Sequence, residues 1–77
     1  MIDPIAVCKQ HDILIISENL GTVCGFYQNA YGQPTIHINM NCPPKFQEYA
    51  IEYLLLNGFL INPNKMKFLR CEQLEKC

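Results

Sequence analysis

Residues 34–57 read PTIHINMNCPPKFQEYAIEYLLLN, and two patterns in this stretch decide the fold. The first is a strict alternation of polar and apolar residues, with Ile36, Ile38 and Met40 at the apolar positions. Because successive side chains of a strand point to opposite faces, the alternation predicts a half-buried strand in an antiparallel sheet. The residues expected on its polar face are Thr35, His37 and Asn39.

The second pattern is an apolar helix that follows directly. Proline is tolerated in the first turn of a helix but not in its interior, so a helix is predicted to begin near Pro43. Apolar residues then recur at the i, i+3, i+4, i+7, i+8 spacing from Phe46 to Leu54, and further apolar residues widen this face. A helix that is apolar on nearly all sides is usually central. Asn57 and Gly58 are predicted to end it.

The residues before this stretch predict one short helix and two more strands. Asp3 can cap a helix whose first residue is Pro4, and this helix is expected to run to about His11. The apolar run at 13–16 predicts a buried strand. A further strand is predicted over residues 23–28, and residues 29–33 form its hairpin connection to the alternating strand.

Beyond the central helix, Asn62, Pro63 and Asn64 form a break, and a last helix is predicted over Lys65–Lys76. Together these elements predict a single small α+β domain over residues 1–77. We expect a small antiparallel sheet of about three strands, packed on a central apolar helix, with flanking N- and C-terminal helices.

Charge and hydropathy exclude several classes of partner. Six Lys and Arg residues stand against seven Asp and Glu residues, so the net charge is −1 and direct nucleic-acid binding is not expected. The cluster of Lys65, Lys67 and Arg70 is interpreted as a solvated helix face. Neither a signal peptide nor an apolar run long enough for a membrane span is apparent, so no membrane contact and a cytoplasmic location are expected.

The cysteines predict packing rather than a disulfide framework. There are five of them, at positions 8, 24, 42, 71 and 77, and none forms a Cys-x-x-Cys pair. Their number is odd, and without an export signal Cys8, Cys24 and Cys42 are expected to be small buried hydrophobic residues. A structural metal held by scattered cysteines with His11 or His37 is the less favoured alternative, and no cofactor is expected.

The order of these elements resembles the amino-terminal half of the ImmA/IrrE family of zinc metallopeptidases, over roughly residues 3–57. The likeness is carried by Gly25-Phe26-Tyr27, by the strand at 34–39, and by residues 41–49, which lead into the apolar helix. Members of the family continue this helix with Ala-His-Glu-Leu-Gly-His, where His-Glu-x-x-His binds zinc and supplies the catalytic carboxylate.

The same register in this chain reads Glu52-Tyr-Leu-Leu-Leu-Asn57, so both imidazoles and the carboxylate are replaced. Sliding the register to make Glu48 or Glu52 the catalytic carboxylate does not restore zinc ligands, because the only histidines are His11 and His37. The single serine, Ser17, lacks a nucleophile-elbow motif, and no glycine-rich phosphate loop is present. The resemblance therefore implies a truncated, metal-free scaffold that is not an enzyme, with no catalytic or metal residue.

The resemblance also suggests a partner. Family members typically cleave repressor proteins of phages, mobile elements or stress responses. A non-catalytic relative is expected to bind such a transcriptional repressor stoichiometrically, as an antirepressor or co-regulator of the lysis–lysogeny type. The alternative is a phage-encoded inhibitor of a host enzyme or defence system.

The predicted binding surface lies after the central helix, where a small fold has little interior left for apolar side chains. Its residues are Phe59, Leu60, Met66, Phe68 and Leu69. These residues either cap the core or form a partner or homodimer surface. In the second case, an Asp at Phe68 or Leu69 should weaken association while the monomer stays folded.

Overall fold

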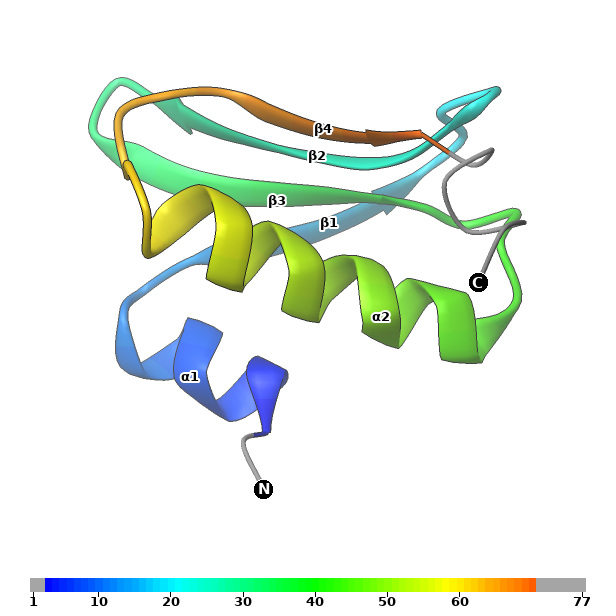
Figure 1. The fold of residues 1–77 in the computed structure, drawn as a ribbon, viewed down its shortest axis with the longest axis horizontal. Coiled ribbons are helices and arrows are strands. Elements are labelled where there is room, and N and C mark those ends of the chain that lie inside the picture. Colours follow the sequence, from blue (N-terminus) through cyan, green and yellow to red (C-terminus); the bar gives the residue numbers. More distant parts are fainter. Residues whose placement is uncertain (1–2, 71–77) are drawn as a thin grey trace.

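The computed structural model describes residues 3–70 as an α+β fold in which a four-stranded sheet carries both α-helices on one face (Figure 1). The strand order is β1-β3-β2-β4. In chain order the elements are α1 (Pro4–Gln10), β1 (Leu14–Glu18), β2 (Val23–Ala30), β3 (Gln33–Asn39), α2 (Pro44–Leu54), the π-helical turn η1 (Leu55–Phe59) and β4 (Lys67–Arg70). Among the described residues, no helix is both long and apolar enough to cross a membrane.

Local signals set the ends of several elements as predicted. The Asp3 carboxylate accepts hydrogen bonds from the backbone N–H groups of Ile5 and Ala6, at 3.1 and 3.4 Å, and so caps α1. Tyr31 and Gly32 have φ values of 54° and 80°, as a two-residue hairpin turn between β2 and β3 requires. Helix α2 begins at Pro44, one residue after the predicted start.

The sheet is mixed rather than antiparallel. β3 folds back from β2 through the hairpin and lies between β2 and β1, so that it is antiparallel to β2 and parallel to β1. β1 is therefore an edge strand and not the buried strand that was predicted. Ile13, just before it, is buried, whereas Leu14 and Ile16 are 51% and 40% exposed.

The predicted C-terminal helix is wrong where the structure describes it. Lys67–Arg70 forms β4, which pairs antiparallel with β2 and raises the sheet from about three strands to four. Leu69 points into the core and is 1% exposed, while its neighbour Phe68 is 50% exposed, which is the two-faced pattern of a strand. The rest of the predicted helix, residues 71–76, lies outside the described residues.

The central helix also ends later than predicted. It continues past Asn57 and Gly58 as η1, with the N–H of Leu60 donating to the carbonyl of Leu55 at 2.9 Å. Gly58 is buried in this turn, and a Cβ there would lie 3.4 Å from the Cβ of Tyr27. This is an ordinary van der Waals distance, so Gly58 packs against β2 inside the turn, and the Asn-Gly pair does not end the helical segment.

The core fills the space between the sheet and the helices. Gly25 is its point of closest approach, because a Cβ there would meet the backbone oxygen of His37 at 2.7 Å and the Cδ1 of Leu54 at 3.1 Å. Met40, predicted on the apolar face, lies past the end of β3 and is 58% exposed. The buried apolar residues are Cys8, Ile13, Cys24, Tyr27, Ile36, Ile38, Ala50, Ile51, Leu54, Leu55 and Leu69.

Candidate functional site

The candidate site is the sheet face opposite the helices, which no other described helix or strand covers (Figure 1). The strand register places four side chains in one line across this face. Ile16 of β1 lies beside His37 of β3, His37 lies opposite Phe26 of β2, and Phe26 lies opposite Phe68 of β4. We call these four residues the cross-strand row, and the surface that they share with Leu14, Glu18 and Gln28 the open face.

The middle of the row is built from stacked rings. The Phe26 and His37 rings are nearly parallel, with centroids 4.3 Å apart, and the Phe26 and Phe68 rings are tilted at 5.5 Å. The Phe26–Phe68 distance is in the range of about 4.5–7 Å in which aromatic pairs attract one another beyond simple burial, and the Phe26–His37 stack is slightly closer. The row is therefore a packed strip in which one hydrogen-bonded histidine lies among apolar side chains, and its two ends, Ile16 and Phe68, reach solvent.

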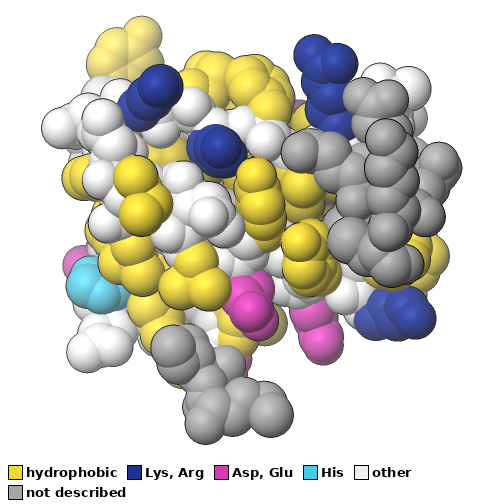
Figure 2. Space-filling view, viewed as in Figure 1, with side chains coloured by type: hydrophobic (Ala, Val, Ile, Leu, Met, Phe, Trp, Pro, Cys, Tyr) yellow, Lys and Arg dark blue, Asp and Glu magenta, His cyan; other side chains and the backbone are white. Residues whose placement is uncertain are grey.

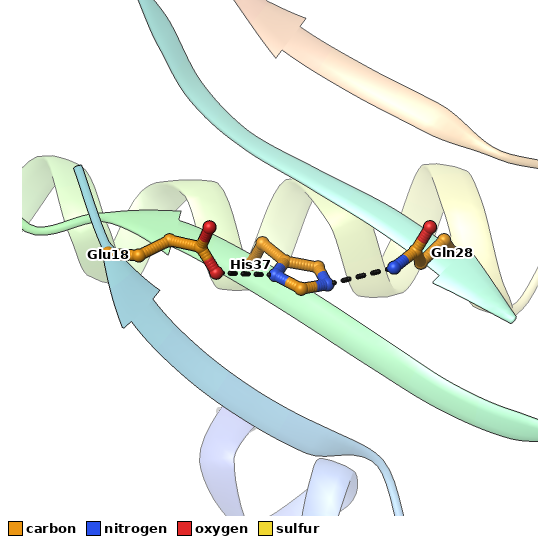
Figure 3. Close-up of polar contacts among 3 residues, drawn as sticks. All are labelled: Glu18, Gln28 and His37. Carbon is orange, nitrogen blue, oxygen red and sulfur yellow. Dashed lines mark hydrogen bonds and ion pairs between the residues drawn. The ribbon is translucent and has the colours of Figure 1, made fainter. Parts of the chain in front are cut away.

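His37 is held by side chains on both sides, as Figure 3 shows. Its Nδ1 lies 2.9 Å from a carboxylate oxygen of Glu18, and its Nε2 lies 3.1 Å from the amide nitrogen of Gln28. An amide nitrogen can only donate, so Nε2 accepts and the ring proton lies on Nδ1, which donates to Glu18. Both ring nitrogens are thus occupied by hydrogen bonds to side chains of neighbouring strands.

The structure divides the five residues predicted to bind a partner. Leu69 is 1% exposed and offers no surface in the monomer, and Phe59 is partly buried against the core, with its ring 6.1 Å from that of Tyr27. Leu60, Met66 and Phe68 are each about half exposed. Of these three, Phe68 belongs to the open face.

Sequence reasoning missed the other apolar members of the open face. Leu14 and Ile16 occur in an unbroken apolar run, which does not show which residues face outward. Phe26 was placed in a predicted strand and in the Gly25-Phe26-Tyr27 segment of the family resemblance, but not on an exposed face. The neighbours of these residues become visible only once β1, β3 and β2 are placed side by side.

The helix positions that the ImmA/IrrE resemblance would match with the zinc motif make packing contacts or local hydrogen bonds. Leu54, which that resemblance would place at the catalytic carboxylate, is fully buried beneath Gly25. Asn57 donates to the backbone oxygen of Tyr53 at 3.2 Å, and the Lys67 ammonium lies 5.8 Å from the centre of the Tyr53 ring. Within residues 3–70, no three His, Cys, Asp or Glu side chains gather closely enough to hold a metal ion.

A hollow on the helical side of the molecule is the alternative candidate site. It has a volume of about 530 Å³ and is lined by residues of α1 and α2, including Lys45, Glu48 and Glu52. These charged side chains are exposed, and the buried part of the lining is Ile51. Figure 2 shows this side of the molecule, where hydrophobic side chains reach the surface in separate patches among charged ones. The hollow has no buried polar group to orient a ligand, which favours the open face as the candidate site.

Comparison with known proteins adds no relative. No protein-family model, curated protein or solved structure matches this chain. The likeness to the ImmA/IrrE family therefore stays a prediction from the sequence motifs.

Proposed function

We propose that this protein is a non-catalytic regulator that binds a transcriptional repressor of a phage or mobile element through its open face, as an antirepressor or co-regulator. The observation that carries the proposal is the cross-strand row, a largely apolar strip of packed side chains around His37 that no described element covers. Exposed apolar surface of this kind typically marks a site of protein association.

The row has the properties of an interface centre. Leu14, Ile16 and Phe68 are 51%, 40% and 50% exposed, so complete burial by a partner would contribute roughly 1 kcal/mol for each side chain. The stacked rings at the centre are already ordered, so little conformational entropy is lost when a partner covers them. Aromatic side chains held in this way are frequent among the residues that dominate binding energy.

Charge suggests which partner surface fits. Glu18 lies on β1 at one edge of the sheet, and Arg70 lies on β4 at the other edge, near the same end of the strands. Arg70 shares a face with Phe68, because side chains two apart in a strand point the same way. A complementary partner would therefore present an apolar ridge across the row, with a basic group toward Glu18 at the β1 edge.

Two observations favour a regulator over an enzyme. Leu54 packs against Gly25 at the position of the catalytic carboxylate, and both ring nitrogens of His37 are taken up by Glu18 and Gln28. The choice of a repressor as partner rests on the resemblance to peptidases whose substrates are repressors.

The proposal is tested by affinity capture from the bacterial host and from strains that express repressors of resident phages. Wild-type protein is compared with Phe68→Asp, which charges the open face, and with Ile61→Asp, a control at a site that is 74% exposed after η1. We expect a repressor to be recovered with the wild type and with Ile61→Asp, and lost with Phe68→Asp. Equal recovery with all three proteins, or enrichment of no transcription regulator, would overturn the proposal.

The same experiment separates the second candidate function. Recovery of a host enzyme or a defence protein in an open-face-dependent manner would identify an inhibitor instead. Gene neighbours give an independent indication, since a repressor and an integrase beside this gene favour the antirepressor, and a cluster of early anti-host genes favours the inhibitor. Self-association lost in Phe68→Asp would identify a homodimer surface.

A further inference from the structure

A pair of thiols lies at the junction of the sheet and α2, away from the cross-strand row. The sulfur atoms of Cys24, in β2, and Cys42, in the segment before α2, are 3.4 Å apart although the residues are 18 positions apart in sequence. A disulfide bond is about 2.05 Å long, so a closure of about 1.4 Å would join them.

An irregularity in β2 brings the first thiol to this place. Val23 and Gly25 pair with Arg70 and Leu69, consecutive residues of β4, so Cys24 is an extra residue in a β-bulge. Regular alternation would turn Cys24 to the open face together with Phe26. Instead it is 2% exposed and belongs to the core on the helical side.

Hydrogen bonds to the backbone of Cys42 fix the position of the second thiol. The N–H of Cys42 donates to the carbonyl of Asn39 at 3.1 Å, and the side-chain amide of Gln47 donates to the carbonyl of Cys42 at 2.7 Å. Asn39 is itself fixed, because its amide donates to the carbonyls of Gly21 and Val23 beside Cys24. The two cysteines are thus positioned by one connected set of hydrogen bonds.

We propose that Cys24 and Cys42 are a peroxide-oxidisable dithiol that forms an intramolecular disulfide between β2 and the start of α2. Cys42 is partly exposed and reacts first, giving a sulfenic acid and one water from thiol and hydrogen peroxide. The Cys24 sulfur then attacks the Cys42 sulfur, the S–O bond breaks, and a second water leaves. In total, two thiols lose two hydrogen atoms and one peroxide becomes two waters.

The remaining described cysteine provides an internal control. Cys8 lies in α1 and is fully buried, and burial raises the pKa of its thiol, so its reactive thiolate is disfavoured. Under mild peroxide Cys8 should stay reduced while the pair is oxidised. This inference does not depend on the proposed function.

Peptide mapping tests the proposal on the full-length wild-type protein. Fully reduced, folded protein is treated with equimolar hydrogen peroxide, then denatured and alkylated. The tryptic peptide of residues 10–45 contains Cys24 and Cys42 and no other cysteine. After oxidation we expect this peptide to carry no alkyl group and to be lighter by two hydrogen atoms than its reduced form. Chymotryptic cleavage of the peptide after Tyr27 or Tyr31 should leave two fragments joined by a disulfide.

Matched variants define the outcomes. In Cys8→Ser, Cys24 and Cys42 should form the disulfide as in the wild type. In Cys42→Ser, Cys24 should stay reduced and therefore be alkylated. Disulfide formation should also raise the melting temperature by about 15–20 °C, given the loop length and the size of the chain. Alkylation of both cysteines in wild-type protein, a link from either one to another cysteine, or sulfinic acid at Cys42 without a link would each overturn the proposal.

Discussion

Two adjacent residues of β4 give the sharpest test of the fold, because they point to opposite faces of the sheet. Leu69 is 1% exposed, so Leu69→Ala should lower the free energy of unfolding by about 2–5 kcal/mol through lost burial and the cavity left behind. Phe68 is 50% exposed and contacts Phe26 on one side, so Phe68→Ala should cost only about 1 kcal/mol.

The total stability makes this contrast measurable. A chain of 77 residues is expected to have a free energy of unfolding of about 4–12 kcal/mol, so Leu69→Ala removes a large part of it. Urea unfolding followed by circular dichroism measures the loss of free energy in each variant. The dependence of the unfolding free energy on urea concentration should be the same for both variants. The two residues also separate folding from association, since Leu69→Asp should unfold the monomer and Phe68→Asp should not.

Equal losses, or a larger loss for Phe68→Ala, would refute the described register of β4. A slip of one residue exchanges the inward and outward side chains along the whole strand, so the order of the two effects would reverse.

Three further changes probe the interior. Gly25→Ala should destabilise by about 1–3 kcal/mol in urea unfolding, because the new Cβ meets the His37 carbonyl, and an unchanged midpoint would contradict the close contact. Asn39→Ala removes the donor to two backbone carbonyls and the acceptor for the Asn41 N–H, so a loss of about 2–4 kcal/mol is expected, and a neutral effect would argue against this network. Burial of Tyr27 raises the pKa of its hydroxyl above the ordinary value of 10.0, and a hydrogen bond from Asn29 opposes this shift. The contribution of the neutral hydroxyl to stability is therefore present below pH 10 and is lost as the pH rises through the folded-state pKa. Tyr27→Phe should remove that alkaline loss of stability. It should also cost about 1 kcal/mol at neutral pH, because the hydroxyl donates to the carbonyl of Pro63. If the variant and the wild type lost stability identically at alkaline pH, Tyr27 would not be the titrating group.

Local signals in the sequence predicted the elements that depend on neighbouring residues. The cap at Asp3 and a hairpin connection within residues 29–33 each rest on contacts within a few positions, and the structure confirms both. β3 forms where the alternation predicts a strand, but its burial does not alternate, because Thr35 and Asn39 are 5% and 1% exposed. β4 was missed because Lys67–Arg70 becomes a strand by pairing with β2, which is distant in sequence. Short strands of this kind take their conformation from the partner strand more than from their own composition.

The candidate site was less predictable for the same reason. His37 could be recognised as a polar-face residue, but its partners Glu18 and Gln28 come from two other strands. The insertion of β3 between β1 and β2, and with it the parallel pairing, leaves no mark in the hydrophobic pattern. Phe68 was selected for its excess apolar character, which does not distinguish it from buried Leu69.

The cross-strand row takes one residue from every strand of the sheet, and this has a consequence for when the surface exists. β2 and β3 are joined by a tight turn and can pair early, whereas β4 must close a long loop to reach β2. The row is complete only after that last pairing. A partner that requires both Ile16 and Phe68 would therefore distinguish finished molecules from folding intermediates, and a chain with β4 detached should lose binding while its hairpin stays protected from hydrogen exchange.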